Sequence, residues 1–341
     1  MTTYQKRRAE LQRDPKTWLV TGAAGFIGSN IVEELLRLDQ FVLGLDDFSS
    51  GHQRNLDEVE RAVEPAAWDR FEMETGDIRN LEAVREACDC VDYVLHHAAI
   101  GSVPLSIEKP LLAHDVNVTG TFNLLLAAQE AGARRFVYAT SSAVYGDDAT
   151  LPKVEEKIGR CLSPYALTKL VNESYASMAA SCYGLETVGL RYFNIFGPRQ
   201  DPNGAYAAVI PKWIAKMMRN EPVEIFGDGE TTRDFCHVAD VVQANILAAT
   251  CPEKDSINRV FNVARRGKTT LNELYEILRS RLAPFHPELQ NAKPVYRDFR
   301  AGDVRHSEAS IDAVTKALGY EPQFTVASGL DQALEWYRKN L

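Results

Sequence analysis

A glycine-rich turn at residues 22–28 constrains the fold of this chain more than any other feature of its sequence. The turn reads Gly-Ala-Ala-Gly-Phe-Ile-Gly and lies between an apolar run at 17–20 and a segment with helical spacing at 26–36. Glycines at a strand-to-helix turn let the backbone approach a pyrophosphate, which also meets the free N–H groups of the helix N-terminus. The turn therefore predicts a dinucleotide site that includes Gly22, Gly25, Phe26, Ile27 and Gly28.

Short apolar runs and helical segments alternate beyond this turn. We expect strands at 41–45, 71–74, 93–96, 135–139 and 186–191, and helices at 81–87, 117–131 and 164–181. Such alternation requires crossover connections and is typical of a parallel sheet covered on both faces. The predicted fold class is α/β, with a Rossmann-type doubly wound parallel sheet.

Polar residues at the ends of the expected strands identify the dinucleotide. Asp46 ends the second strand 18 residues after Gly28, where a carboxylate holds the ribose hydroxyls of an adenosine and repels the extra phosphate of NADP. Asp77 and Ile78 follow the third strand and suit an adenine contact, and Ala98 follows the fourth. These positions predict NAD as the cofactor. The alternative is a structural glycine turn with a solvated aspartate.

The amino-acid composition changes near residue 196, where Gly, Pro, Asn and Asp become frequent. A chain of 341 residues also exceeds the roughly 250–300 residues that one hydrophobic core serves. We expect an NAD-binding domain at 16–195 plus 237–265, and a smaller, interleaved substrate domain at 196–236 plus 266–341. Residues 1–15 form a helical N-terminal extension in this prediction.

Composition and charge exclude several classes of function. The net charge of −9 argues against a nucleic-acid binder, and no apolar run is long enough to span a membrane. The charged N-terminus lacks the apolar core of a secretory signal, and the six cysteines are scattered without metal-ligand spacing. These features predict a cytoplasmic protein with free thiols and no metal site.

Tyr165 and Lys169 lie four residues apart, so they share one face of the helix expected at 164–181. Ser141 ends the fifth strand, and Asn117 lies in the preceding helix. A free tyrosine has a pKa near ~10, and a cation about 4 Å away at an effective dielectric of ~20 is worth on the order of 4 kcal/mol. We therefore expect Lys169 and an oxidised nicotinamide to bring the pKa of Tyr165 towards neutrality, which makes it an acid/base. The alternative is a pair of ordinary surface residues.

The arrangement of Ser141, Tyr165 and Lys169 resembles the short-chain dehydrogenase/reductase family. Taken over 17–341, the chain resembles the extended members of that family, the UDP-hexose 4-epimerases. The motifs that carry the resemblance are Gly22–Gly28, Ser141–Asp147, Ser163–Tyr165, Leu190–Asn194, Asp228–Phe235 and Arg300–Arg305. The resemblance implies reversible oxidation of a sugar at carbon 4 by a retained NAD, a homodimer with a four-helix interface, and a role in nucleotide-sugar and polysaccharide biosynthesis.

The same resemblance implies roles for individual residues. Ser141 and Tyr165 would contact the sugar 4-hydroxyl, Lys169 would hold the nicotinamide ribose, and Asn117 and Phe193 would contact the cofactor. Asn194 and Arg233 would bind the diphosphate with help from Arg300, and Asp303 would bind the uridine ribose. The remaining expected substrate contacts are Gly101, Ser102, Ser142, Ala143, Ala208, Val209 and Ser307.

Within that group the chain resembles the branch that acts on UDP-N-acetylglucosamine and UDP-N-acetylgalactosamine. Ser307 stands where epimerases of UDP-glucose place a bulky Tyr, which leaves room for an acetamido group. Ala143 and Leu105 depart from the usual Ser and Arg of the branch, so UDP-glucose and the uronic acids stay as alternative substrates. A dehydratase would carry Asp-Glu in place of Ser142-Ala143, and a non-enzymatic NAD sensor would not need Tyr165 and Lys169.

Overall fold

A seven-stranded sheet forms the larger half of the molecule, in a computed structural model that describes residues 1–202, 208–299 and 305–340. The strand order is β11-β6-β5-β4-β1-β2-β3, and every pairing in the sheet is parallel. The strands are β1 (Thr17–Thr21), β2 (Phe41–Asp46), β3 (Phe71–Thr75), β4 (Tyr93–His96), β5 (Arg135–Ser141), β6 (Thr187–Tyr192) and β11 (Arg259–Val263). The doubly wound parallel sheet predicted from the sequence is confirmed.

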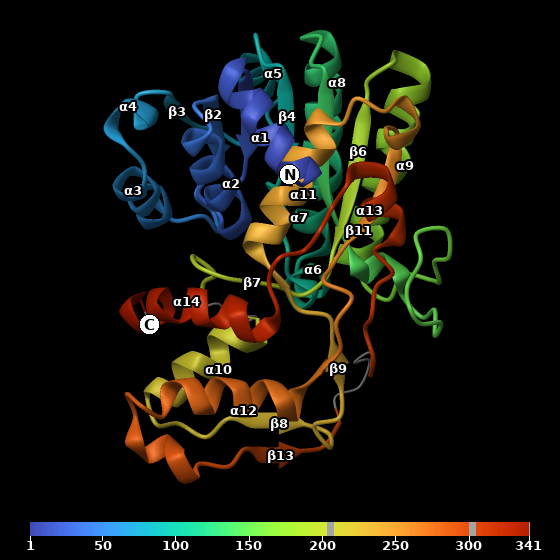
Figure 1. Ribbon diagram of the computed structural model, residues 1–341. Helices are drawn as coiled ribbons and strands as arrows, with labels where there is room; N and C mark the ends of the chain where they lie inside the picture. The colour runs from blue at the N-terminus through green and yellow to red at the C-terminus, as the bar shows by residue number, and fades with distance from the viewer. Residues whose placement is uncertain (203–207, 300–304, 341) are drawn as a thin grey trace.

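Helices cover both faces of this sheet (Figure 1). One face carries α1 (Thr3–Arg13), α2 (Phe26–Arg37) and α11 (Val238–Thr250), and the other carries α5 (Leu81–Cys88), α8 (Gly120–Glu130) and α9 (Pro164–Tyr183). Each face has its own apolar core, with Ile31 and Val241 buried on the first and Leu124 and Ala176 on the second. The remaining helices here are α3 (Gln53–Ala62), α4 (Pro65–Trp68), α6 (Val103–Glu108), α7 (Pro110–His114), α13 (Asp312–Leu318), a π-helix (Asp115–Thr119) and 3-10 turns (Ser142–Tyr145, Lys254–Ser256).

Local sequence determines where α9 begins, and thereby where Tyr165 lies. The Ser163 hydroxyl accepts a hydrogen bond from the N–H of Ala166 at 3.1 Å, and Pro164 occupies the first helical position. Both residues favour a helix start at this point. The serine hydroxyl pairs with an N–H that has no partner within the helix, and proline has no N–H that would need one. Tyr165 is therefore in the first turn of α9, with Lys169 one turn further on.

A smaller lobe lies beyond the carboxyl ends of the strands (Figure 1). Trp213, Leu274, Leu278 and Tyr337 are buried together in its core. Its elements are α10 (Val209–Met218), β8 (Glu224–Phe226), α12 (Leu271–Leu282), a 3-10 turn (Pro287–Asn291), β13 (Val295–Arg297) and α14 (Val326–Asn340). Two short pairings connect the lobes: β7 (Ile195–Phe196) with β10 (Cys236–His237), and β9 (Thr232–Arg233) with β12 (Thr269–Thr270).

One segment packs differently from the domain boundaries expected above, which assigned 266–341 to the smaller lobe. Val314 and Leu318 of α13 are buried in the core of the large sheet, where α13 contacts β11 and α11. These apolar side chains are four residues apart on one helical face, and they cover β11, the edge strand of the sheet.

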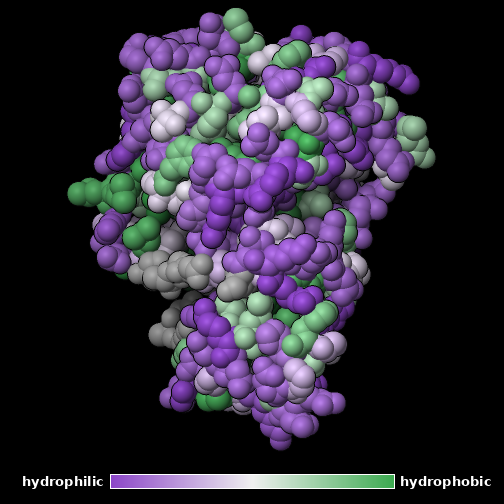
Figure 2. Space-filling view, turned by 90° about the vertical axis from the view of Figure 1, so that its left-hand side faces the viewer, coloured by the Kyte–Doolittle hydropathy of each residue, from purple (hydrophilic) through white to green (hydrophobic). Residues whose placement is uncertain are grey.

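The N-terminal helix α1 begins with a capping box formed by Thr2 and Gln5, and its Leu11 is buried. On the face shown in Figure 2, hydrophilic residues predominate and hydrophobic ones are scattered. Among the residues that the structure describes, no helix combines the length and the apolar character that a membrane crossing requires.

Candidate active site

Two cavities meet at the carboxyl edge of the sheet. The first, of about 610 Å³, is lined by the glycine-rich turn and by the ends of β2, β3, β4 and β5. The second, of about 570 Å³, is lined mainly by the smaller lobe. Both include Asn194, Ile195, Gln200 and Ala208 in their walls. The two cavities therefore adjoin at these residues, and we call them together the cleft between the lobes.

The glycine-rich turn leaves no room for side chains. A Cβ atom on Gly28 would lie 2.0 Å from the carbonyl oxygen of Gly22, and one on Gly22 would lie 2.8 Å from the backbone nitrogen of Ala98. Gly22 also has a φ of +71°, and Gly25 caps α2 without a side-chain hydrogen bond. The first N–H groups of α2 thus stay open to the cavity, as the pyrophosphate of a dinucleotide requires.

Two carboxylates expected at the cofactor site line the first cavity together with Ile78 and Ala98. Asp46 accepts hydrogen bonds from the N–H of Ala24 (2.9 Å) and of Phe48 (2.8 Å), while burial raises its pKa. Asp77 accepts from Nε of Arg79 at Oδ1 and from Nη2 at Oδ2, and this guanidinium lowers the pKa of Asp77. Asp46 is therefore tied to the glycine-rich turn itself, at the edge of the space where the residues fit NAD.

The three expected catalytic residues lie together in the wall of the first cavity. Ser141 at the end of β5 hydrogen-bonds the hydroxyl of Tyr165 and accepts a hydrogen bond from the N–H of Ala143 at 3.1 Å. The ammonium of Lys169 donates to the carbonyl oxygen of Ala139 at 3.0 Å. Lys169 is 3% exposed, so its charge lies within the protein at the floor of the cleft.

The pKa of Tyr165 departs from the expectation that the charge of Lys169 would help to lower it. Burial raises the pKa of Tyr165, and the interaction that opposes this rise is the hydrogen bond from Ser141 rather than the charge of Lys169. Burial also lowers the pKa of Lys169 to about 8. The chain alone therefore keeps Tyr165 protonated, and formation of a phenolate requires positive charge from a bound group.

Two residues expected to touch the cofactor do not lie in the cavity wall. Asn117 is fully buried, where its amide pairs with the backbone of Ile100 and donates to Thr168 at 3.0 Å. Phe193 is also fully buried and packs against Tyr145. Its neighbour Tyr192 lines the cavity instead, because successive side chains of an extended segment point to opposite faces.

Tyr192 belongs to a buried group at the cavity that the sequence did not reveal. Its ring stacks on His97 with a centroid distance of 6.1 Å, and Asn245 donates to the Tyr192 hydroxyl at 2.8 Å. His97 also pairs with Asn245, and burial lowers the pKa of His97 to about 3. The imidazole is thus neutral at physiological pH, and it presents a flat polar surface to the cofactor space.

The expected substrate residues are distributed along the cleft. Gly101, Ser142 and Ala143 line the first cavity, Val209 and Arg233 line the second, and Asn194 and Ala208 line both. Ser102 instead caps α6 through a bond from the N–H of Leu105, and Ser307 pairs its backbone with Thr232 beside Arg233. Arg300 and Asp303 lie outside the described residues. The second cavity also contains Phe226, Phe299 and Arg305, a mixture of rings and cations that suits a nucleotide.

Comparisons with known proteins agree with this geometry. Residues 18–264 match the NAD dependent epimerase/dehydratase family. A putative UDP-glucose 4-epimerase of Methanocaldococcus jannaschii is 35% identical over 328 residues, covering 94% of this chain and 98% of the relative. A UDP-glucuronate 4-epimerase of Thermodesulfobacterium geofontis is 31% identical over 326 residues, covering 95% and 97%. The solved UDP-N-acetylglucosamine 4-epimerase of Methanobrevibacter ruminantium M1, in complex with UDP-N-acetylmuramic acid, is 34% identical with a TM-score of 0.87, covering 96% and 99%.

Proposed function

The chain belongs to the NAD-dependent epimerase/dehydratase family, and from this membership we propose that it interconverts UDP-N-acetylglucosamine and UDP-N-acetylgalactosamine. It is an NAD-dependent UDP-sugar 4-epimerase. The observation that carries the reaction is that Ser141, Tyr165 and the buried Lys169 line the same cavity as the glycine-rich turn. The 4-epimerase activity follows from the family, and the N-acetylated pair of sugars as its substrates is our proposal.

Tyr165 is the group that moves the proton. As a phenolate, which the positive charge of bound NAD would favour, its Oη takes the proton of the sugar 4-hydroxyl and later returns it, so the chain ends each cycle in the state in which it began. Ser141 donates to Oη and thereby favours the phenolate during the first half of the cycle. When bound, NAD supplies the reversible oxidation of carbon 4. Because the pKa of Tyr165 is raised by burial, its hydroxyl holds the proton between the two halves.

Inversion requires that the sugar turn while its nucleotide stays in place. The second cavity suits this division, because Arg233 lines it and Asn194 lines both cavities, so these two side chains can hold the diphosphate. The 4-keto sugar then rotates about the diphosphate and presents its other face. On the cofactor side, Asp46 would bind the adenosine ribose and Lys169 the nicotinamide ribose.

Small residues support the choice of the N-acetylated sugars. Gly101 forms part of the first cavity wall, and Ser307 lies two residues after Arg305, which lines the second cavity. A small side chain leaves volume for a 2-acetamido group, and a serine hydroxyl can accept a hydrogen bond from its N–H. The same cleft also admits plain UDP-glucose, and relatives are named for UDP-glucose and UDP-glucuronate. These two sugars are the alternative substrates.

The deciding experiment measures epimerisation without added cofactor. Purified protein is incubated separately with UDP-N-acetylglucosamine, UDP-glucose and UDP-glucuronate, and each 4-epimer is quantified by anion-exchange chromatography. We expect a 4-epimer from UDP-N-acetylglucosamine, formed with the highest kcat/KM of the three substrates. A higher kcat/KM for either other sugar would replace the proposed substrate.

We also propose that two chains pair through α8 and α9. Apolar side chains are exposed beside these helices: Leu167 on α9 is 53% exposed, and Leu111 on the adjoining α7 is 79% exposed. Burial of such side chains against a second copy removes apolar surface from water. Light scattering coupled to size exclusion should give twice the chain mass, and Leu167→Glu should reduce it towards one chain.

A further inference from the structure

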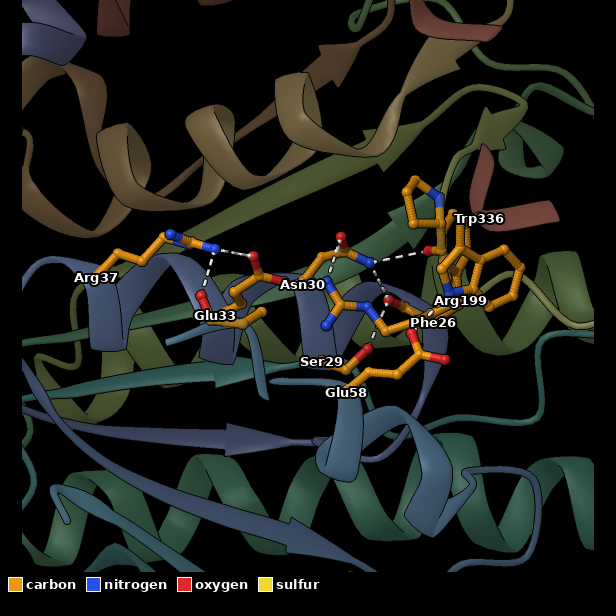
Figure 3. A network of polar contacts seen from close by, with 10 residues as sticks. Phe26, Ser29, Asn30, Glu33, Arg37, Glu58, Arg199 and Trp336 are labelled. Carbon is orange, nitrogen blue, oxygen red and sulfur yellow. Dashed lines mark hydrogen bonds and ion pairs between the residues drawn. The ribbon is translucent and has the colours of Figure 1, made fainter. Parts of the chain in front are cut away.

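A network of polar contacts joins the first turns of α2 to the loop after β7 (Figure 3). Nη2 of Arg199 donates to Oδ1 of Asn30 at 3.0 Å and to the carboxylate of Glu33. Nδ2 of Asn30 donates to the carbonyl oxygens of Phe26 at 2.8 Å and of Pro198 at 3.2 Å. We call Asn30, Glu33, Pro198 and Arg199 the clasp. Asn30 thus binds the loop twice, as an acceptor from Arg199 and as a donor to Pro198.

Arg199 occupies an unfavourable position. Its backbone has a φ of +68°, a left-handed conformation that non-glycine residues rarely adopt. Its side chain is 5% exposed, and its Nε has no hydrogen-bond partner among the described residues. Two unfavourable features at one residue indicate that its position serves function rather than stability.

The segments joined by the clasp border the space where the cofactor fits. Phe26 follows Gly25 at the start of α2, and Arg199, Gln200 and Asp201 line the same cavity. The loop before α3 is joined to this segment as well, because His52 lies 2.9 Å from the carboxylate of Asp201. The clasp therefore fixes both sides of the cavity with respect to each other.

A second contact between the lobes lies beside the clasp. Nε1 of Trp336, on α14 of the smaller lobe, donates to Oε2 of Glu58 on α3 at 2.6 Å (Figure 3). Glu33 keeps Arg37 as a partner at 2.9 Å, so removal of the Arg199 guanidinium would not leave that carboxylate unpaired. A change at Arg199 should thus loosen the loop and leave α2 intact.

We propose that Arg199 is a positioning residue that retains NAD, because it holds the loop 197–202 against the first turns of α2. This inference rests on the proposed function: a 4-epimerase uses the same NAD in both halves of each cycle and gains nothing from exchanging it. The clasp makes cofactor release slower than turnover. Its residues act through the loop and take no part in the proton transfer at Tyr165.

The test measures how fast NAD leaves the purified holoprotein. The variant Arg199→Gly removes the guanidinium and fits the φ of +68° without strain, and Asn30→Ala removes the partner. Each protein is mixed with an NAD-consuming enzyme, and the NAD that remains bound is quantified over time. We expect release to accelerate about tenfold in Arg199→Gly, equivalent to ~1.4 kcal/mol, and by less in Asn30→Ala, in which Arg199 keeps its bond to Glu33.

A matched control separates this effect from general loosening. Arg135 is also buried, at 7% exposure, and pairs with Glu186 at 2.7 Å, but it lies at the amino end of β5, away from the cleft. Arg135→Ala should release NAD within about twofold of the wild-type rate. Wild-type release in Arg199→Gly or equal acceleration in Arg135→Ala would overturn the proposal.

Activity assays keep this result separate from the proposed function. At saturating NAD, Arg199→Gly should recover the wild-type kcat while its requirement for added NAD rises. If the wild-type protein turned over another UDP-sugar in preference to the N-acetylated pair, the substrate proposal would fail, but the comparison of NAD release rates would still decide the role of Arg199.

Discussion

The ammonium nitrogen of Lys169 lies 3.0 Å from the carbonyl oxygen of Ala139, within a cleft where the lysine is almost completely buried. Burial lowers the pKa of Lys169 from 10.5 to about 8. The lysine is therefore charged at neutral pH and loses its charge just above it. The oxidising half of the reaction gains from a phenolate at Tyr165 and a cation at Lys169, so the two groups set opposite limits on activity.

We predict a bell-shaped pH profile of kcat whose alkaline limb falls above pH ~8, as Lys169 loses its proton. Lys169→Arg should lower kcat but move the alkaline limb to higher pH, since a guanidinium stays protonated there. Both profiles are measured with the same UDP-sugar at saturation. An unchanged alkaline limb in Lys169→Arg would assign that limb to another group.

Stability should change in the opposite direction over the same pH range. The folded pKa of Lys169 lies below its value of 10.5 in the unfolded chain, so the unfolded state binds more protons between about 8 and 10.5. The free energy of unfolding of wild type, relative to Lys169→Met, should therefore rise across this window by about 3 kcal/mol. The comparison with Met cancels the titration of buried cysteines, and urea unfolding at several pH values measures it.

Tyr165→Phe should abolish turnover and leave NAD bound. The phenol is the proton carrier in the proposed reaction, and removal of a general acid/base typically costs about 10²–10⁴ in rate. The ring remains in α9, and the N–H of residue 165 keeps its bond to the Ser106 hydroxyl at 3.0 Å. Residual activity near the wild-type level, with NAD content unchanged, would show that another group carries the proton.

Sequence patterns predicted those parts of the site that depend on local structure. The glycine-rich turn, Asp46 at a strand end and the Tyr165/Lys169 pair were all found where their spacing placed them. Phe193 was expected to contact the cofactor, whereas the structure packs it against Tyr145 and places Tyr192 in the cavity wall, because the face that the chain presents as β6 ends is set by the tertiary fold. The clasp was missed for a different reason: Asn30 and Arg199 are 169 residues apart, and nothing local marks a pair that only the tertiary fold brings together.

A buried ion pair beneath Ser141 gives a further prediction. Arg191 donates to both oxygens of Glu173, at 2.9 and 2.7 Å, and the Thr140 hydroxyl donates to the same carboxylate at 2.7 Å. Glu173→Ala would leave Arg191 buried without its counter-ion, which typically costs about 3–5 kcal/mol. Because Thr140 precedes Ser141, kcat should fall as well.

Chemical denaturation and kcat are measured on Glu173→Ala together with an exposed counterpart. Asp331 pairs with Arg281 at 2.6 Å on the surface of the smaller lobe, with 61% of its side chain exposed. Asp331→Ala should cost at most about 1 kcal/mol and leave kcat unchanged. Similar losses of stability in the two variants would contradict the importance of burial at Glu173.

Substitution of Ser307 tests the selection of the sugar. A Tyr at this position would fill the volume that we assign to the acetamido group, and overpacking of this kind costs about 1–3 kcal/mol. Ser307→Tyr should therefore lower kcat/KM for UDP-N-acetylglucosamine about 10- to 200-fold relative to UDP-glucose. The control is Ser280→Tyr on the exposed face of α12, which should change neither value. An unchanged ratio in Ser307→Tyr would remove the proposed role of Ser307.

A graded series of glycine substitutions tests the cofactor cradle. An added Cβ would lie 2.0 Å from the Gly22 carbonyl oxygen at Gly28, 3.1 Å from it at Gly25, and more than 4 Å from any atom at Gly101. The contact at Gly28 is with backbone that cannot move without reshaping the turn, so Gly28→Ala should lose bound NAD and at least about 1–3 kcal/mol of stability. Gly25→Ala should lose less, and Gly101→Ala should keep both. NAD content per chain and thermal unfolding rank the three variants, and a Gly28→Ala protein with as much NAD as Gly101→Ala would mean that the close approach at Gly28 is not needed for cofactor binding.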